Sequence, residues 1–161
     1  MDLILSIPDK HQFEDPSFYQ PFVREFANHY HNFSKRLKVD EICNCLHKFS
    51  KWRYPKSSLY NSILADIAYH FNTMRHEDHI RVIRSFANIQ LKQTDLFDRV
   101  LLRVNRNMVS FTPYFNSLIN HLYNVNYDSN LYRETIPTYI EKMRFNVHSR
   151  VLLIRTIMCI E

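Results

Sequence analysis

One pattern of apolar and polar positions occurs four times along this chain. Each copy opens with Leu or Phe followed by an aromatic residue, and apolar side chains then return at three- and four-residue steps. That spacing places the apolar side chains on one face of an amphipathic helix. The copies cover residues 18–30, 59–71, 96–108 and 131–143, and the last one is weakened by Thr135 at an apolar position.

A second helical spacing lies between these copies, and it also recurs at intervals of 35 to 37 residues. Its copies cover residues 42–52, 79–89, 115–125 and 153–160. We call these segments A helices and the first kind B helices. Self-similarity at such a period is typical of stacked helical hairpins, in which no unit buries its apolar face alone. The sequence therefore predicts an all-α fold, a right-handed α-solenoid of antiparallel helix pairs with a repeat of about 36 residues.

Acidic or hydroxyl residues mark the expected helix starts, where they satisfy free backbone N–H groups and the helix dipole. The predicted B helices cover residues 16–33, 57–72, 94–109 and 128–144. The predicted A helices cover residues 40–53, 77–90, 112–125 and 147–160. Pro113 fits the first turn of its helix. Pro137 falls inside the last B helix, where we expect a kink or a helix broken in two.

These helices form one predicted domain, residues 1–161, whose two ends look unfinished. It comprises an N-terminal extension or partial repeat (1–15), a first B helix (16–39), three hairpin repeats (40–75, 76–110 and 111–145) and an unpaired A helix (146–161). Repeat arrays normally end in units with a polar outer face. Either this chain is part of a longer array, or neighbours in an assembly cover its ends. On the second interpretation we expect neighbouring protein subunits to cover the last helix, through Leu153, Ile154, Ile157, Met158 and Ile160.

The composition excludes several classes of function. The 161-residue chain has no glycine, although Rossmann folds, P-loops and nucleophile elbows need glycine for close backbone approach. No nucleophile–base motif stands out, so we expect a protein that is not an enzyme and uses no cofactor. Cys43, Cys45 and His47 resemble a metal motif, but residues two apart on a helix diverge, and we expect no metal. Three cysteines fit a reducing compartment, and no apolar run is long enough to cross a membrane.

The polar face of the A helices carries no acidic residue, although the chain has 16 of them and a net charge of +5. Lysine and arginine can contact phosphates, and amides can hydrogen-bond bases. We therefore expect this face to bind RNA. The alternatives are an ordinary solvated face or contact with protein. The candidates are Asn44, His47, Lys48, Lys51, Arg81, Arg84, Asn88, Asn120, His121, Asn124 and Arg155, with Ser85 and Ser117 on the same face.

Aligned in this way, residues 16–160 resemble the degenerate helical repeats of organellar RNA-binding proteins. The period and the Leu-(Tyr/Phe)-x-x-Ile-Leu signature are similar to heptatricopeptide and octotricopeptide arrays, as found in RAP-domain and FAST-kinase-like proteins. The segment Phe115-Asn116-Ser117-Leu118-Ile119-Asn120 is also similar to a pentatricopeptide unit. No RAP domain follows in this chain.

The resemblance implies a location in the mitochondrial matrix and a non-catalytic RNA-binding role. It implies a structural component of an organellar ribosome, bound to ribosomal RNA, or of another ribonucleoprotein. The alternative function is a helical-repeat scaffold for protein–protein interaction that makes no direct contact with RNA.

Overall fold

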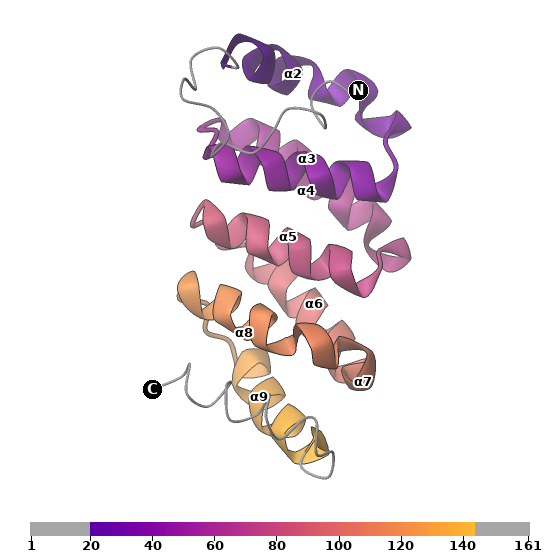
Figure 1. Cartoon of the computed structure of the whole chain (residues 1–161), viewed down its shortest axis with the longest axis vertical. Coiled ribbons are helices and arrows are strands. Elements are labelled where there is room, and N and C mark those ends of the chain that lie inside the picture. Colours follow the sequence, from indigo (N-terminus) through magenta and orange to yellow (C-terminus); the bar gives the residue numbers. More distant parts are fainter. Residues whose placement is uncertain (1–19, 144–161) are drawn as a thin grey trace. The chain divides into compact units, whose positions relative to one another are not determined.

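The computed structural model describes residues 20–143, which are helical and contain no strand (Figure 1). The chain divides into two compact units between Ile89 and Gln90, and each unit is described by itself. The predictions for the N-terminal extension, the start of the first B helix and the final A helix lie outside the described residues. The described part agrees with the all-α class expected from the sequence.

Over residues 20–89, the first unit holds four α-helices and two short 3-10 turns. They are α2 (Gln20–Phe33), η3 (Ser34–Arg36), α3 (Val39–Trp52), α4 (Ser57–His70), η4 (Phe71–Thr73) and α5 (His76–Asn88). The predicted helices 40–53, 57–72 and 77–90 agree with α3, α4 and α5 to within two residues. The hydrophobic spacing thus located each of these helices.

The core of the first unit forms where α3 packs against both α4 and α5. Leu46 and Phe49 of α3, Ile63 of α4, and Ile83 and Phe86 of α5 are completely buried. All five occupy apolar positions of the two repeated spacings. Complete burial of such a side chain contributes roughly 1.5–3 kcal/mol, so this seam is the main stabilising feature of the unit.

The second unit departs from prediction where one helix was expected over residues 94–109. It contains α6 (Thr94–Arg106), α7 (Met108–Phe111), η5 (Thr112–Tyr114), α8 (Phe115–Asn124) and α9 (Asn130–Met143). Helix α6 ends because Asn107 leaves the helical region of backbone space, at φ −126° and ψ 41°. Its backbone N–H donates to the carbonyls of Arg103 and Val104, and its Nδ2 donates to Arg103 as well. These bonds satisfy the last turn of α6.

Helix α9 continues through Pro137, so of the two expected alternatives, a kink or a helix broken in two, the break is wrong. Packing on both sides of the proline holds the helix together. Before it, the buried Thr135 hydroxyl donates to the Leu131 carbonyl and accepts a hydrogen bond from Asn105 Nδ2. After it, the Tyr139 ring stacks on Phe115 of α8, with 3.5 Å between ring centroids. These contacts offset the backbone hydrogen bond that proline removes.

Without glycine, the chain uses other residues in the left-handed turns that follow α3, α5 and α8. Arg53, Gln90 and Asn126 have φ values of 49°, 55° and 50°. Two of these turns are closed by the same long backbone bond, from Tyr54 N to Phe49 O and from Tyr127 N to Leu122 O. This is the helix ending for which glycine is ordinarily selected.

Candidate nucleic-acid interface

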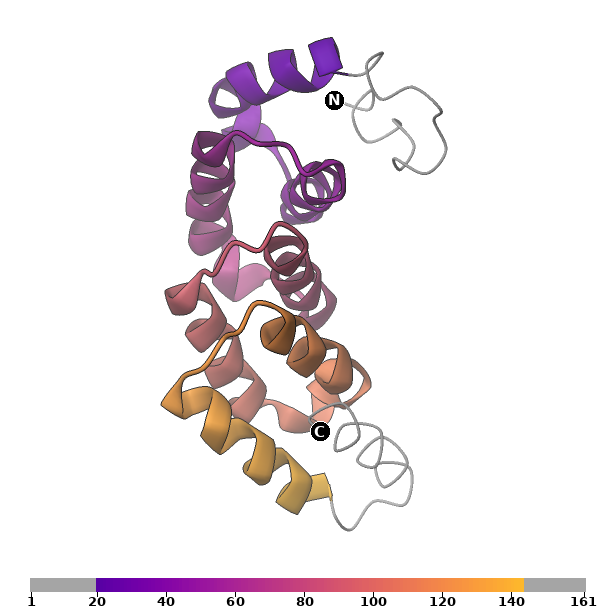
Figure 2. The same ribbon diagram turned by 90° about the vertical axis from the view of Figure 1, so that its left-hand side faces the viewer.

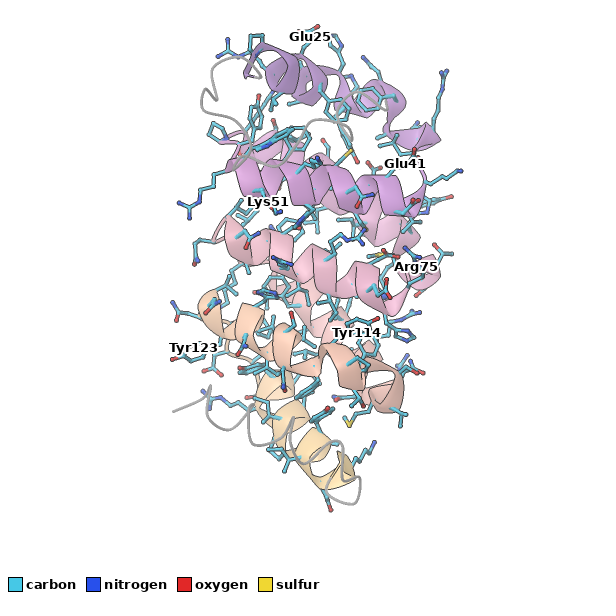
Figure 3. The ribbon with its side chains drawn as sticks, in the orientation of Figure 1. Glu25, Glu41, Lys51, Arg75, Tyr114 and Tyr123 are labelled. Carbon is cyan, nitrogen blue, oxygen red and sulfur yellow. The ribbon has the colours of Figure 1, made fainter. Side chains whose placement is uncertain are left out.

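The A helices of the first unit lie side by side and run in the same direction. In Figure 3, Glu41 and Arg75 mark the N-terminal ends of α3 and α5 at one end, and Lys51 lies at the opposite end of α3. Figure 2 shows α3 and α5 nearly along their axes, with α4 in a separate layer. Neighbouring parallel helices bring residues at equivalent positions close together.

A hydrogen bond fixes the register between α3 and α5. Arg81 Nη1 donates to Asn44 Oδ1 over 2.9 Å, and the two residues occupy equivalent positions, 81 and 44, of successive A helices. The structure therefore brings together two of the predicted RNA-contacting side chains. An arginine has five N–H donors, and Asn44 takes one of them, so Arg81 keeps capacity to bind a further acceptor.

The remaining candidates of the first unit follow this pair toward the C-terminal ends of the two helices. Arg84 is exposed, whereas His47, Lys48, Lys51 and Asn88 are partly buried. The surface is therefore lined by side chains that are partly held by the protein. We call the seven residues Asn44, His47, Lys48, Lys51, Arg81, Arg84 and Asn88 the α3–α5 face.

A buried carboxylate lies at the N-terminal end of the α3–α5 face. The Asp78 side chain is only 2% exposed and lies 3.9 Å from Arg81 Nη1. It also accepts hydrogen bonds from the backbone N–H and the guanidinium of Arg75, and these bonds raise the pKa of Arg75. Asp78 thus partly neutralises Arg81.

Among the residues that the structure describes, positive charge is concentrated in segment 20–89. Residues 20–89 contain eleven Lys and Arg against six Asp and Glu, whereas residues 90–143 contain six against five. Within segment 20–89, residues 42–65 carry four Lys and Arg and no acidic residue. Because clustered charge of one sign raises the local concentration of a polyanion, the acid-free segment 42–65 is the better candidate for phosphate contact.

The predicted residues of α8, in the second unit, offer different chemistry. Asn124 is exposed, Asn120 and His121 are partly buried, and Ser117 Oγ lies 3.2 Å from His121 Nε2. The helix contains no Lys or Arg. These side chains can exchange hydrogen bonds with a base edge, but they supply no positive charge for a phosphate.

Two details of the predicted surface differ from the sequence analysis. Ser85 is buried, and its hydroxyl donates to the Arg81 carbonyl, so it does not belong to the polar face. Tyr123 of α8 was overlooked, although its side chain is 57% exposed. Its position three residues after Asn120 is the signal that places it beside the predicted face. Arg155 and the five predicted C-terminal contact residues lie outside the described residues.

The cysteines of the first unit are packing residues in this structure. Cys43 and Cys45 are buried free thiols, and burial raises the pKa of each to about 12. Over residues 20–143, no three His, Cys, Asp or Glu side chains are grouped so that they could hold a metal ion.

Comparison with known proteins returns no relative from which a role could be transferred. The chain matches no protein-family model, and no curated protein or solved structure is detectably similar to it. In the part of the chain that the structure describes, no helix is long and apolar enough to span a membrane.

Proposed function

We propose that this protein is a non-catalytic, helical-repeat RNA-binding protein that serves as a structural component of a ribonucleoprotein. The observation that carries the proposal is the pairing of α3 and α5 through Arg81 and Asn44. That pairing supports a surface on which Lys48, Lys51 and Arg84 follow one another along two adjoining helices. Cations on a shared, partly rigid surface suit the regularly spaced phosphates of a single strand.

We further propose that the helices form a solenoid with a repeat of about 36 residues, of the heptatricopeptide type. The left-handed residues Arg53, Gln90 and Asn126, at intervals of 37 and 36 residues, support a common ending for successive A helices. A place in an organellar ribosome, within the mitochondrial matrix, is the part of the proposal that follows from the family resemblance alone.

The test is charge reversal on the α3–α5 face. We expect the double variant Lys51→Glu, Arg84→Glu to bind single-stranded RNA at least tenfold more weakly than the wild-type chain. Because each neutralised phosphate releases counterions, the slope of log K against log salt concentration should also fall, by about 0.7 for each lost contact. Fluorescence anisotropy with labelled oligouridine at several salt concentrations measures both quantities.

A matched control is the variant Arg106→Glu, Lys142→Glu, which changes the net charge equally at exposed positions of α6 and α9. We expect it to retain most of the affinity. Equal losses in both double variants would refute a specific face and leave only attraction by net charge. Wild-type protein that binds no RNA, but that captures a protein partner through this face, would favour the scaffold alternative.

A further inference from the structure

We propose that the turn between α3 and α4 is a second phosphate-binding element, which holds the backbone of single-stranded RNA through Arg53 and Lys56. The inference rests on the proposed RNA-binding function and extends the surface beyond the helix face that the sequence predicted. The turn reads Lys51-Trp52-Arg53-Tyr54-Pro55-Lys56, and it lies within the acid-free stretch of residues 42–65. Lys51 is shared between the turn and the α3–α5 face.

The turn is held rigidly by contacts that leave its cations outside. The Phe49 carbonyl accepts hydrogen bonds from Tyr54 N and from the buried hydroxyl of Tyr60 on α4, each over 3.1 Å. The rings of Trp52 and Tyr54 both pack against Phe49, with centroids 5.8 and 5.6 Å away. The backbone and aromatic side chains are thereby fixed, and ligand binding need not order them.

Arg53 and Lys56 themselves are exposed. Lys56 Nζ donates to Asn28 Oδ1 of α2 over 2.7 Å, a neutral partner that leaves its charge uncompensated. Neither residue forms an ion pair with an acidic residue of segment 20–143, and Glu25 of α2 instead contacts His29 at 2.9 Å. Two exposed cations on a fixed backbone, close to Lys51 in sequence, suit consecutive phosphates.

The backbone of Arg53 provides an independent argument. Its φ of 49° lies in the left-handed region, which for residues other than Gly and Asn costs roughly 1–2 kcal/mol. The equivalent positions hold the uncharged residues Gln90 and Asn126. An arginine in a strained position that glycine would occupy at less cost points to a role for its charge.

A purely structural role for Arg53 is the competing explanation. A cation near a helix C-terminus interacts favourably with the helix dipole, by about 0.3–1 kcal/mol when exposed. On this explanation the arginine stabilises α3 and contacts no ligand. The two explanations predict opposite results for replacement by glycine, because glycine removes both the strain and the charge.

The experiment compares Arg53→Gly, Lys56→Gln and the control Gln90→Gly in the full-length chain. Thermal unfolding is followed by circular dichroism, and binding to labelled oligouridine is followed by anisotropy over a range of salt concentrations. We expect Arg53→Gly to unfold at the wild-type temperature or above it and to bind roughly three- to tenfold more weakly. The salt slope should fall by about 0.7, and Lys56→Gln should reproduce this loss.

The control Gln90→Gly relieves the same backbone strain without removing a charge, so its unfolding temperature should rise and its affinity should stay unchanged. Wild-type affinity and salt slope in Arg53→Gly would overturn the inference and leave the proposed function intact. A lower unfolding temperature in Arg53→Gly, with binding lost only in proportion to unfolding, would assign Arg53 to the helix dipole. If polyglutamate competes with the labelled oligouridine as effectively as unlabelled RNA does, the phosphate-binding turn is also overturned. If the wild-type chain binds no RNA, both the phosphate-binding turn and the proposed RNA-binding function are refuted.

Discussion

Replacement of Asp78 by alanine should destabilise the first unit more than the equivalent change at the start of the preceding A helix. Asp78 and Glu41 hold equivalent positions, 37 residues apart. Each accepts a hydrogen bond from the backbone N–H three residues earlier, at Arg75 and Lys38 respectively. Loss of this capping bond costs about 1 kcal/mol at either site. The Glu41 side chain makes no further hydrogen bond in the part of the chain that the structure describes.

Asp78 makes additional contacts, which set the expected difference. Its carboxylate is 2% exposed and accepts charge-assisted bonds from the Arg75 guanidinium, whose side chain is 65% exposed. A fully buried bond of this kind would contribute about 1.5–3 kcal/mol. Solvent at Arg75 weakens these bonds. We therefore expect Asp78→Ala to cost about 2–3 kcal/mol and Glu41→Ala to cost about 1 kcal/mol.

Urea unfolding followed by circular dichroism measures both losses, provided that the slope m stays constant among the variants. Asp78→Asn retains the shape of the side chain and should fall between wild type and Asp78→Ala, because one acceptor oxygen remains. Equal losses at Asp78 and Glu41 would show that the guanidinium contacts contribute nothing. A loss below 0.5 kcal/mol for Asp78→Ala, the range of ordinary surface changes, would refute the reasoning altogether.

Three further predictions concern the second helical unit and the thiols. Pro137→Ala should stabilise the chain by up to about 3 kcal/mol, since the exposed proline removes one backbone hydrogen bond from the interior of α9. A lower free energy of unfolding in urea for this variant would contradict the prediction. Thr135→Val should cost about 1–3 kcal/mol, because it removes the acceptor of Asn105 Nδ2. The control Thr138→Val should change stability by less than 0.5 kcal/mol, because among residues 20–143 the Thr138 hydroxyl bonds only to Glu134 of its own helix. Burial raises the pKa of Cys43 and Cys45 to about 12, so the folded thiols stay protonated at pH 9 to 11 while the unfolded thiols ionise. The free energy of unfolding should therefore fall as the pH rises above about 8.5. In a Cys159→Ser background, thiol labelling of the two buried cysteines at pH 8 should proceed only at the rate of unfolding.

The sequence located α3, α4 and α5 because the apolar positions keep helical spacing within each of these helices. The same spacing wrongly predicted that one helix continues past Asn107, since Met108 and Phe111 continue the apolar series and are both buried. Only the side-chain and backbone bonds of Asn107 reveal that α6 ends there. Periodicity reports which residues are buried, and it does not report whether one helix or two bury them.

The candidate surface was predictable as a set of positions but not as a set of contacts. Spacing placed Ser85 with the polar residues because it treats a helix as having one buried side. Helix α5 also packs against α3, and Ser85 is buried. The bond between Arg81 and Asn44 depends on the register of two helices, which no property of either helix alone determines. Arg53 was overlooked because its importance lies in a backbone angle rather than in a pattern of residue types.

The bond between Arg81 and Asn44 has a consequence for how a ligand would be recognised. A free arginine side chain loses up to about 2 kcal/mol of rotamer entropy when it is immobilised. Here Arg81 loses most of this rotamer entropy when the protein folds, because Asn44 already holds the guanidinium in one orientation. A phosphate that binds Arg81 would find the guanidinium already oriented. Asn44→Ala would make that guanidinium more mobile without removing any charge. Asn44 would then influence binding through the mobility of its neighbour, even if it never touched the ligand.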